Sequence, residues 1–444
     1  MRDGMLLEGA YDGLIRQSGN ARYSPCAICV CSSTARRGGL PGSVRSEIQG
    51  VMRKFSSLNR SRSRTRRSAA NPHGIVIVDD LFPNLITGFR VAEFSWLLRA
   101  GVVREVMTSL AQLEDHLPSF LELYPDLEGR VGPYAPDRLP EFELAYVVFL
   151  DNARILLPDF ARHHLDFVME LYPGGGLRLG TAETARTLHD VVTSPRLRGI
   201  LTTQPRVTEY LAAIGPKLPP VEEVLGVVVN ESYFGPEEGF GRAHPYFGLG
   251  KGHLDVLFAA HRYDERGVHK GYPVFIEVCR LLSEAGVPLR AHVVGGHRAD
   301  DVRLGDLDQR FTFHGPLVTD QFQRMALGMD LVLSPNQPSL VRPGAWDGFP
   351  TGSCVEAALC GVGVVCSDEL DQNRLFTDGE DILISPPDPE LYCARILDLL
   401  QRADGVANLA ESGRRSFRQA YSTEAQLVPR KNLLVAALGA VRDD

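Results

Sequence analysis

Long apolar runs are missing from this sequence, and their absence limits where we expect the protein to work. No stretch reaches the roughly 18 consecutive apolar residues that a membrane-spanning helix needs. The amino-terminal region also lacks the continuous apolar segment of a secretory signal. We therefore expect a cytoplasmic protein that is either free in the cytoplasm or associated peripherally with a membrane surface.

Cysteine is scarce, since 8 cysteines in 444 residues do not make a disulfide framework. Cys26, Cys29 and Cys31 form a single C-x-x-C-x-C pattern without a second pair of ligands, so we expect no metal site. The other five fall in helix or strand patterns and are predicted to be small buried residues of a reducing compartment: Cys279, Cys354, Cys360, Cys366 and Cys393.

Only the amino-terminal segment of the chain has an excess of positive charge. Residues 1–73 hold 13 Lys and Arg against 4 Asp and Glu, whereas the remainder holds 34 against 51, so the net charges are +9 and −17. The acidic remainder argues against nucleic acid as a partner. Residues 1–73 show no sustained hydrophobic period and end in the Arg-rich segment 60–67, which predicts a disordered extension. A dispensable extension, a membrane tether, a nucleic-acid tail and a transit peptide all fit this composition.

The length favours two α/β domains, because a single hydrophobic core rarely grows this large. Gly, Pro and aromatic residues without a period mark a linker between them. The predicted boundaries are the extension at 1–73, an amino-terminal domain at 74–230, the linker at 231–253, a carboxy-terminal domain at 254–425, and a final helix at 426–444 that returns to the amino-terminal domain.

Short β-branched runs alternate with helical patterns in both domains, which is typical of parallel sheets built from βαβ units. The predicted strands of the first domain are 75–78, 145–150, 166–171, 199–203 and 225–230, and a helix is predicted at 89–99. The predicted strands of the second domain are 255–260, 290–295, 310–313, 330–334, 362–366 and 382–384, with helices at 272–285, 319–328 and 389–402. We therefore expect two Rossmann-like domains that face a cleft.

The chain is organised around the stretch 347–366. It begins with Asp347-Gly-Phe-Pro-Thr-Gly-Ser-Cys-Val-Glu356, a glycine-rich loop that opens a helix, and ends in a buried strand. Such a loop and helix N-terminus favour an anion such as a diphosphate. Glu356 lies one turn into the helix, where a carboxylate can accept two hydrogen bonds from a ribose diol. Ser353 and Glu356 equally fit a capping box that needs no ligand.

This stretch resembles the acidic-Gly-Phe-Pro…Glu-Ala signature of family 4 (group 1) glycosyltransferases. Three further segments are similar to that family, and with the signature they cover about residues 255–400. They are 258–271, with Phe258-Ala-Ala-His-Arg262 and His269-Lys-Gly271, then the paired runs 313–317 and 329–335, and 377–389. The resemblance implies a GT-B fold and retaining transfer of a sugar from a nucleotide-sugar donor, without a metal or cofactor. The acceptor (glycan, lipid or small molecule) and the oligomeric state are not implied.

The resemblance also implies the site residues. Asp347 would lie near the transferred sugar and Glu356 would hold the ribose, as the expected catalytic pair. The diphosphate would be bound by Arg262, Lys270 and Gly88. The sugar would be bound by the loop Gly348, Phe349, Pro350 and Thr351. Apart from the resemblance, Tyr172, Gly174 and Gly175 follow the predicted strand 166–171, and we expect their loop to face the cleft because ligands of open α/β sheets bind beyond the carboxyl ends of strands.

The sequence departs from the family pattern in three places. Asp347 is Asp rather than Glu, and it stands nine positions before Glu356 where the usual spacing is eight. Arg262 is farther from Lys270 than in the common pattern. Tyr172 and Pro173 stand where many members have a His, so the role of that His is unassigned.

Two other functions fit the same fold. One is a sugar-nucleotide epimerase or phosphorylase, and the other is a non-catalytic protein that binds sugar nucleotides. Sugar transfer to an acceptor that depends on the donor would separate a transferase from both.

Overall fold

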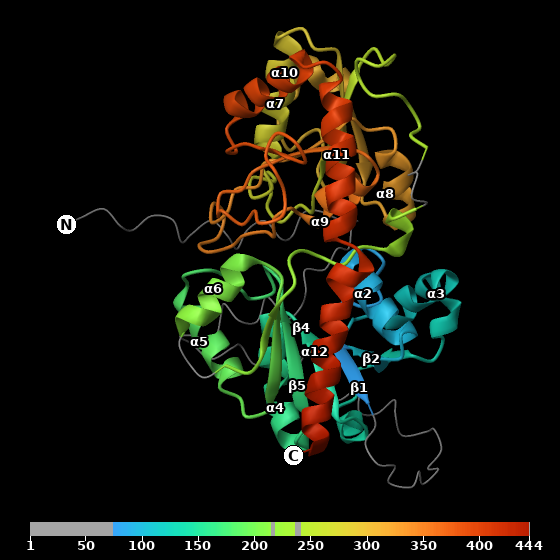
Figure 1. Cartoon of the computed structure of the whole chain (residues 1–444), viewed down its shortest axis with the longest axis vertical. Coiled ribbons are helices and arrows are strands. Elements are labelled where there is room, and N and C mark those ends of the chain that lie inside the picture. Colours follow the sequence, from blue (N-terminus) through green and yellow to red (C-terminus); the bar gives the residue numbers. More distant parts are fainter. Residues whose placement is uncertain (1–73, 215–217, 236–240, 444) are drawn as a thin grey trace, which may run out of the picture. The chain divides into compact units, whose positions relative to one another are not determined.

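The computed structural model describes residues 74–214, 218–235 and 241–443 (Figure 1). The extension predicted at 1–73 lies outside these residues. No helix in the described part of the chain is long and apolar enough to span a bilayer.

The first sheet has seven parallel strands in the order β3-β2-β1-β4-β5-β6-β7. Strands β1, β4 and β5 are buried along their whole length, as expected for a parallel sheet covered on both faces. The strands are β1 Ile75–Asp79, β2 Val103–Thr108, β3 Val131–Pro133, β4 Leu144–Val148, β5 Asp166–Leu171, β6 Leu197–Thr202 and β7 Val221–Glu223.

The helices of this half follow the strands along the chain. They are α2 Gly88–Arg99, α3 Leu113–Leu123, α4 Leu150–His163, α5 Ala182–Val192 and α6 Pro205–Ile214, with 3-10 turns η1 Pro125–Leu127, η2 Pro136–Glu141 and η3 Glu231–Tyr233. The last helix of the chain, α12 Thr423–Asp443, also packs on this sheet, against β4, β5 and β6 (Figure 1).

The second sheet has six parallel strands in the order β10-β9-β8-β11-β12-β13. Its strands are β8 Leu254–Ala259, β9 Leu289–Val294, β10 Phe311–Gly315, β11 Leu331–Ser334, β12 Gly363–Cys366 and β13 Leu383–Ile384. Its helices are α7 Tyr272–Glu284, η4 Gly305–Arg310, α8 Thr319–Ala326, α9 Gly352–Leu359, α10 Pro389–Gln401 and α11 Gly405–Ala420.

Most predicted strands match observed ones to within two residues, but three positions in the first sheet differ. The predicted strand 225–230 is wrong, and β7 lies earlier at Val221–Glu223. Gly226 has φ +98°, and the ring of Tyr421 occupies the place of a side chain there, so the segment turns away from the sheet. Strands β2 and β3 lack a prediction, because β2 contains Arg104 and Glu105 and β3 has only three residues.

Each sheet reverses its strand order at one place, between β1 and β4 in the first and between β8 and β11 in the second. Ligands of open parallel sheets bind outside the carboxyl ends of strands at such a reversal, where the flanking loops separate. A ligand site is therefore expected at the loops after β1, β8 and β11.

Candidate active site

The turn that ends with Gly271 brings the loop after β8 against the segment after β11. Gly271 has φ +72°, and a Cβ there would lie 1.8 Å from the carbonyl oxygen of Pro335. Only glycine allows this approach without a shift of the backbone. Lys270 is thereby held next to Asp347, which follows the same strand β11.

Asp347 is paired with two basic side chains. The Nζ of Lys270 lies 2.5 Å from Oδ1 of Asp347, and the Nε2 of His269 lies 3.2 Å from Oδ2. Burial alone would raise the pKa of Asp347, but the Lys270 ammonium and His269 outweigh it and hold that pKa at about 2. Burial would likewise lower the pKa of Lys270, yet the Asp347 carboxylate raises it. Both groups are therefore charged at neutral pH.

Glu356 is partly buried on α9, and within the described ranges its carboxylate has no hydrogen bond or ion pair. Burial raises its pKa to about 7. The capping box that its spacing allowed is not formed, since α9 has Thr351 at its N-cap without a side-chain cap bond. The hydroxyl of Ser353 instead donates to the carbonyl oxygen of Ala259 at 2.8 Å.

Gly88, the first residue of α2, contacts Glu356, although α2 belongs to the first half of the chain and Glu356 to the second. An ideal Cβ on Gly88 would lie 3.4 Å from Oε1 of Glu356 and 3.9 Å from the hydroxyl oxygen of Thr319. The structure therefore brings Gly88 and Glu356 together, although 268 positions separate them in the sequence.

The loop before α9 is fixed by Gln204, which the sequence analysis missed. The amide N–H of Phe349 donates to Oε1 of Gln204 at 3.1 Å, so this amide is occupied by the protein itself. Nε2 of Gln204 lies 2.9 Å from the place of a Cβ on Gly348. The N–H groups of Gly352 and Ser353, at the start of α9, donate to no partner among the residues that the structure describes.

Arg262 is not brought to Lys270 and Asp347 in this structure. Its guanidinium lies 2.9 Å from Oδ1 of Asp301 and donates to the carbonyl oxygen of Glu265. The extra spacing between Arg262 and Lys270 already set this residue apart from the family pattern.

Tyr172 directs its hydroxyl into the core of the first sheet. The hydroxyl accepts from Nη2 of Arg430 at 3.1 Å and donates to Oε2 of Glu93 at 3.4 Å. Arg430 comes from α12, and its side chain has no exposed surface. The buried group is completed by Glu170, 2.8 Å from Arg430, and by Tyr146, which donates to either carboxylate. Burial, reinforced by the neighbouring Glu170, raises the pKa of Glu93 to about 8.

The loop after Tyr172 has contacts on both sides. Pro173 lies 3.7 Å from the Cβ position of Gly348, in the loop before α9, whereas Gly175 packs within its own domain. Gly175 has φ +50°, and a Cβ there would lie 2.2 Å from the ring of Phe149. Gly174 has φ +85° with nothing within 4 Å of its Cβ position. The glycine at position 175 thus allows the backbone of this loop to lie close to the ring of Phe149.

Across the part of the chain that the structure describes, no group of three or more His, Cys, Asp or Glu side chains is arranged to hold a metal ion. The predicted absence of a metal or cofactor remains a prediction.

The fold and the loops after β8 and β11 define a two-domain α/β protein with a candidate site between its parallel sheets. Residues 254–402, a third of the chain, match the family model of group 1 glycosyl transferases. No curated protein sequence matches the chain.

Solved structures match over most of the chain. Sucrose-phosphate synthase from Thermosynechococcus elongatus is 14% identical with a TM-score of 0.58, over 83% of this chain and 100% of the other. HepE from Anabaena, in complex with UDP and glucose, is 15% identical with a TM-score of 0.55 over the same shares. A glycosyltransferase from Rickettsia africae is 11% identical with a TM-score of 0.60, over 84% of this chain and 100% of the other. The predicted GT-B fold is confirmed, and identities this low carry no more than the fold.

Proposed function

We propose that this protein is a glycosyltransferase that moves a sugar from a nucleotide-sugar donor to an acceptor hydroxyl, with retention at the anomeric carbon and without an essential metal. The observation that carries this proposal is the carboxylate of Glu356, which is partly buried, has no partner in the described structure and faces Gly88. A partly buried carboxylate without a partner is costly, and a ribose diol would supply two hydroxyl donors to it.

The groups for the donor's diphosphate come from the loop after β8 and from the start of α9, the helix that carries Glu356. Lys270 supplies a positive charge, and the amides of Gly352 and Ser353 point from the N-terminus of α9. In the transfer, the bond from the anomeric carbon to the diphosphate oxygen breaks and a bond to the acceptor oxygen forms, while the acceptor proton is released. Lys270 and the helix N-terminus would stabilise the charge that develops on the departing diphosphate.

The proposal is tested first by donor binding, because a ligand that binds only the folded protein raises its melting temperature. UDP-glucose is the first compound, since the fold neighbour HepE is described in complex with UDP and glucose. ADP- and GDP-glucose complete the panel. We expect one of the three to stabilise the wild type and to stabilise Glu356→Gln much less.

The reaction is tested on the donor that binds. We expect slow hydrolysis with water as acceptor, in EDTA, and release of the sugar with its original anomeric configuration by NMR. Binding without hydrolysis or transfer would favour the non-catalytic alternative. A changed sugar configuration in the intact donor would favour an epimerase. Release of the opposite anomer would contradict retention.

A further inference from the structure

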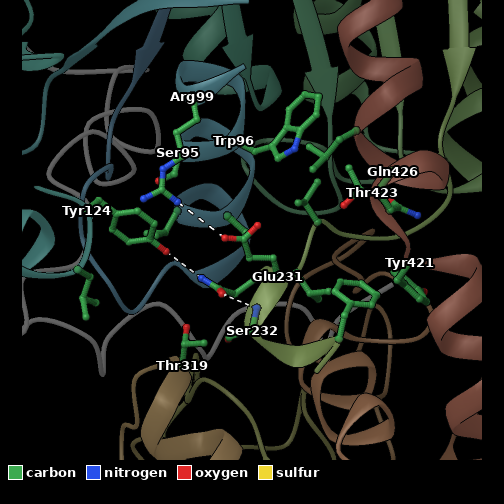
Figure 2. Close-up of a pocket in the computed structure, with 18 of the residues that line it drawn as sticks. Ser95, Trp96, Arg99, Tyr124, Glu231, Ser232, Thr319, Tyr421, Thr423 and Gln426 are labelled. Carbon is green, nitrogen blue, oxygen red and sulfur yellow. Dashed lines mark hydrogen bonds and ion pairs between the residues drawn. The ribbon is translucent and has the colours of Figure 1, made fainter. Parts of the chain in front are cut away.

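A further cavity, of about 510 Å³, lies beside helix α2 and the start of α8 (Figure 2). Its volume falls in the range of about 300–1,000 Å³ that is usual for small-molecule sites. None of the residues assigned above to the donor lines it. A second ligand would therefore not have to compete with the donor for contacts.

Both chain connections between the two sheets line this cavity. The first is the segment 228–234, after β7 and before β8. The second is the segment 421–427, which joins α11, packed on β12, to α12, packed on the first sheet. Helix α2 and the start of α8 complete the walls.

The cavity presents aromatic rings and no uncommitted charge. Trp96, Tyr124, Phe234 and Tyr421 supply the rings. Figure 2 shows Trp96 and Tyr124 from the first half of the chain and Tyr421 from near its end. Arg99 forms two bonds of 2.7 Å with Asp126. It also lies 3.9 Å from Glu231 (Figure 2).

The remaining charge of the wall is also paired, because Asp320 lies 2.9 Å from Arg324. A charged ligand would lose hydration here without gaining a free counter-charge. The side-chain hydroxyls of Ser232, Thr319 and Thr423 line the wall, and within the described residues they have no hydrogen bond (Figure 2). An uncharged ligand with hydrogen-bonding groups matches these walls.

We propose that this cavity is a binding site for an uncharged, ring-bearing small molecule with hydroxyl groups, and that its ligand restrains helix α2. Ala92 and Trp96 of α2 line the cavity, while Gly88 at the start of the same helix meets Glu356. Thr319 touches both places, since it lines the cavity and lies 3.9 Å from the Cβ position of Gly88. Occupation of the cavity thus acts on a helix of the candidate active site without contacting the donor.

The binding is tested with 2-naphthol and, as a charged probe with the same ring system, 2-naphthoate, by titration calorimetry on the full chain. We expect 2-naphthol to bind at least tenfold more tightly than 2-naphthoate. Ala92→Leu should weaken the binding of 2-naphthol at least tenfold, because the added carbons fill the cavity. Ala185→Leu, an exposed alanine of α5, is the matched control and should bind as the wild type does. Equal binding of the two probes, or unchanged affinity in a folded Ala92→Leu protein, would overturn the proposal.

Hydrogen exchange of the wild type locates the probe without any variant. With 2-naphthol bound, amides of 88–99 and 421–427 should exchange more slowly than in the free protein. Slower exchange confined to other segments would place the probe elsewhere and overturn the proposal. Neither measurement needs a nucleotide sugar, so their failure is separate from a failure of the proposed glycosyltransferase function.

Discussion

The amine of Lys270 lies 2.5 Å from Oδ1 of Asp347, although 77 positions separate these residues in the sequence. The residue predicted to hold the donor's diphosphate is thus paired with the residue predicted to lie near the sugar. This pairing is compatible with two alternative roles for Lys270. It either binds the diphosphate directly or only compensates the buried charge of Asp347.

A double-mutant cycle separates these roles. Lys270→Met should weaken binding of the donor by about 1.5–3 kcal/mol if it removes a charge-assisted hydrogen bond to the diphosphate. Asp347→Asn, measured alone, completes the cycle. In the double variant with Asp347→Asn, we expect the affinity to stay low, because no cation is restored. Recovery of wild-type affinity in the double variant would show that Lys270 serves only Asp347. Arg266→Met, an exposed cation of the same loop, is the control and should leave binding unchanged.

The stability of the protein should depend on pH through Glu356. Its pKa is raised from the usual 4.5 to about 7 in the folded protein, so folding favours the protonated form. Stability from this group is therefore present at low pH and is lost as the pH rises from about 4.5 through about 7. Glu356→Gln lacks this loss, and its melting temperature relative to wild type should be higher at pH 8 than at pH 5. A difference that is the same at both values would contradict the raised pKa.

The affinity for a nucleotide sugar should rise with pH in the same range. The ionised carboxylate of Glu356 accepts hydrogen bonds from both ribose hydroxyls, whereas the protonated form loses part of that capacity. We expect UDP-glucose, or whichever donor binds, to bind more tightly at pH 8 than at pH 6 in the wild type and with little pH dependence in Glu356→Gln. Because the donor binds the ionised form of Glu356, binding near pH 6 should release the proton of this group. Calorimetry in two buffers of different ionisation enthalpy would measure that release.

The glycine loop offers a paired test of backbone and packing. Gly174 and Gly175 both have positive φ, but only at Gly175 would a Cβ collide, 2.2 Å from Phe149. Both alanine variants carry the backbone strain, and Gly175→Ala adds overpacking worth about 1–3 kcal/mol. Urea unfolding should therefore show Gly175→Ala to be the less stable variant by about that amount. Equal stabilities would mean that the loop shifts away from Phe149.

The buried arginine of α12 should contribute strongly to stability. Arg430→Met leaves Glu93 and Glu170 beside each other without their shared cation, and breaking such a buried group costs about 3–5 kcal/mol. Lys431→Met changes the exposed neighbour and should stay within about 0.5 kcal/mol of the wild type. Denaturant unfolding of both variants measures the contrast. A loss below about 1 kcal/mol for Arg430→Met would show that a carboxylic acid proton compensates the missing charge.

The sequence was sufficient for the parts of the fold that local patterns specify. Strand β5 lies at the predicted 166–171 because its residues form a continuous buried run bounded by a turn and a Pro-Gly segment. Strands that contain charged residues or are very short were not predicted, as β2 and β3 show. The predicted strand 225–230 failed because Tyr421, almost 200 positions later, occupies the space beside Gly226.

The candidate site divides in a similar way. Lys270, Asp347 and Glu356 lie within short motifs that a reader of the sequence can find, and their roles remain predictions. No role was predicted for His269. Its position next to Lys270, which was predicted to bind the diphosphate, is the sequence feature that could have indicated it. Gln204 gave no signal, because its partner Phe349 lies 145 positions away and a hydrogen bond to a backbone amide leaves no residue pattern.

The position of Arg430 also decides how this protein can be divided for experiments. A fragment that ends near residue 230 would contain Glu93 and Glu170 but not their arginine, and the face of the sheet that α12 covers would be open to water. The amino-terminal half can be produced alone only if residues 423–443 are supplied with it, as a fused segment or a second peptide. The last helix thus completes the first half of the chain, so a protein that ends before α12 would leave Glu93 and Glu170 without Arg430.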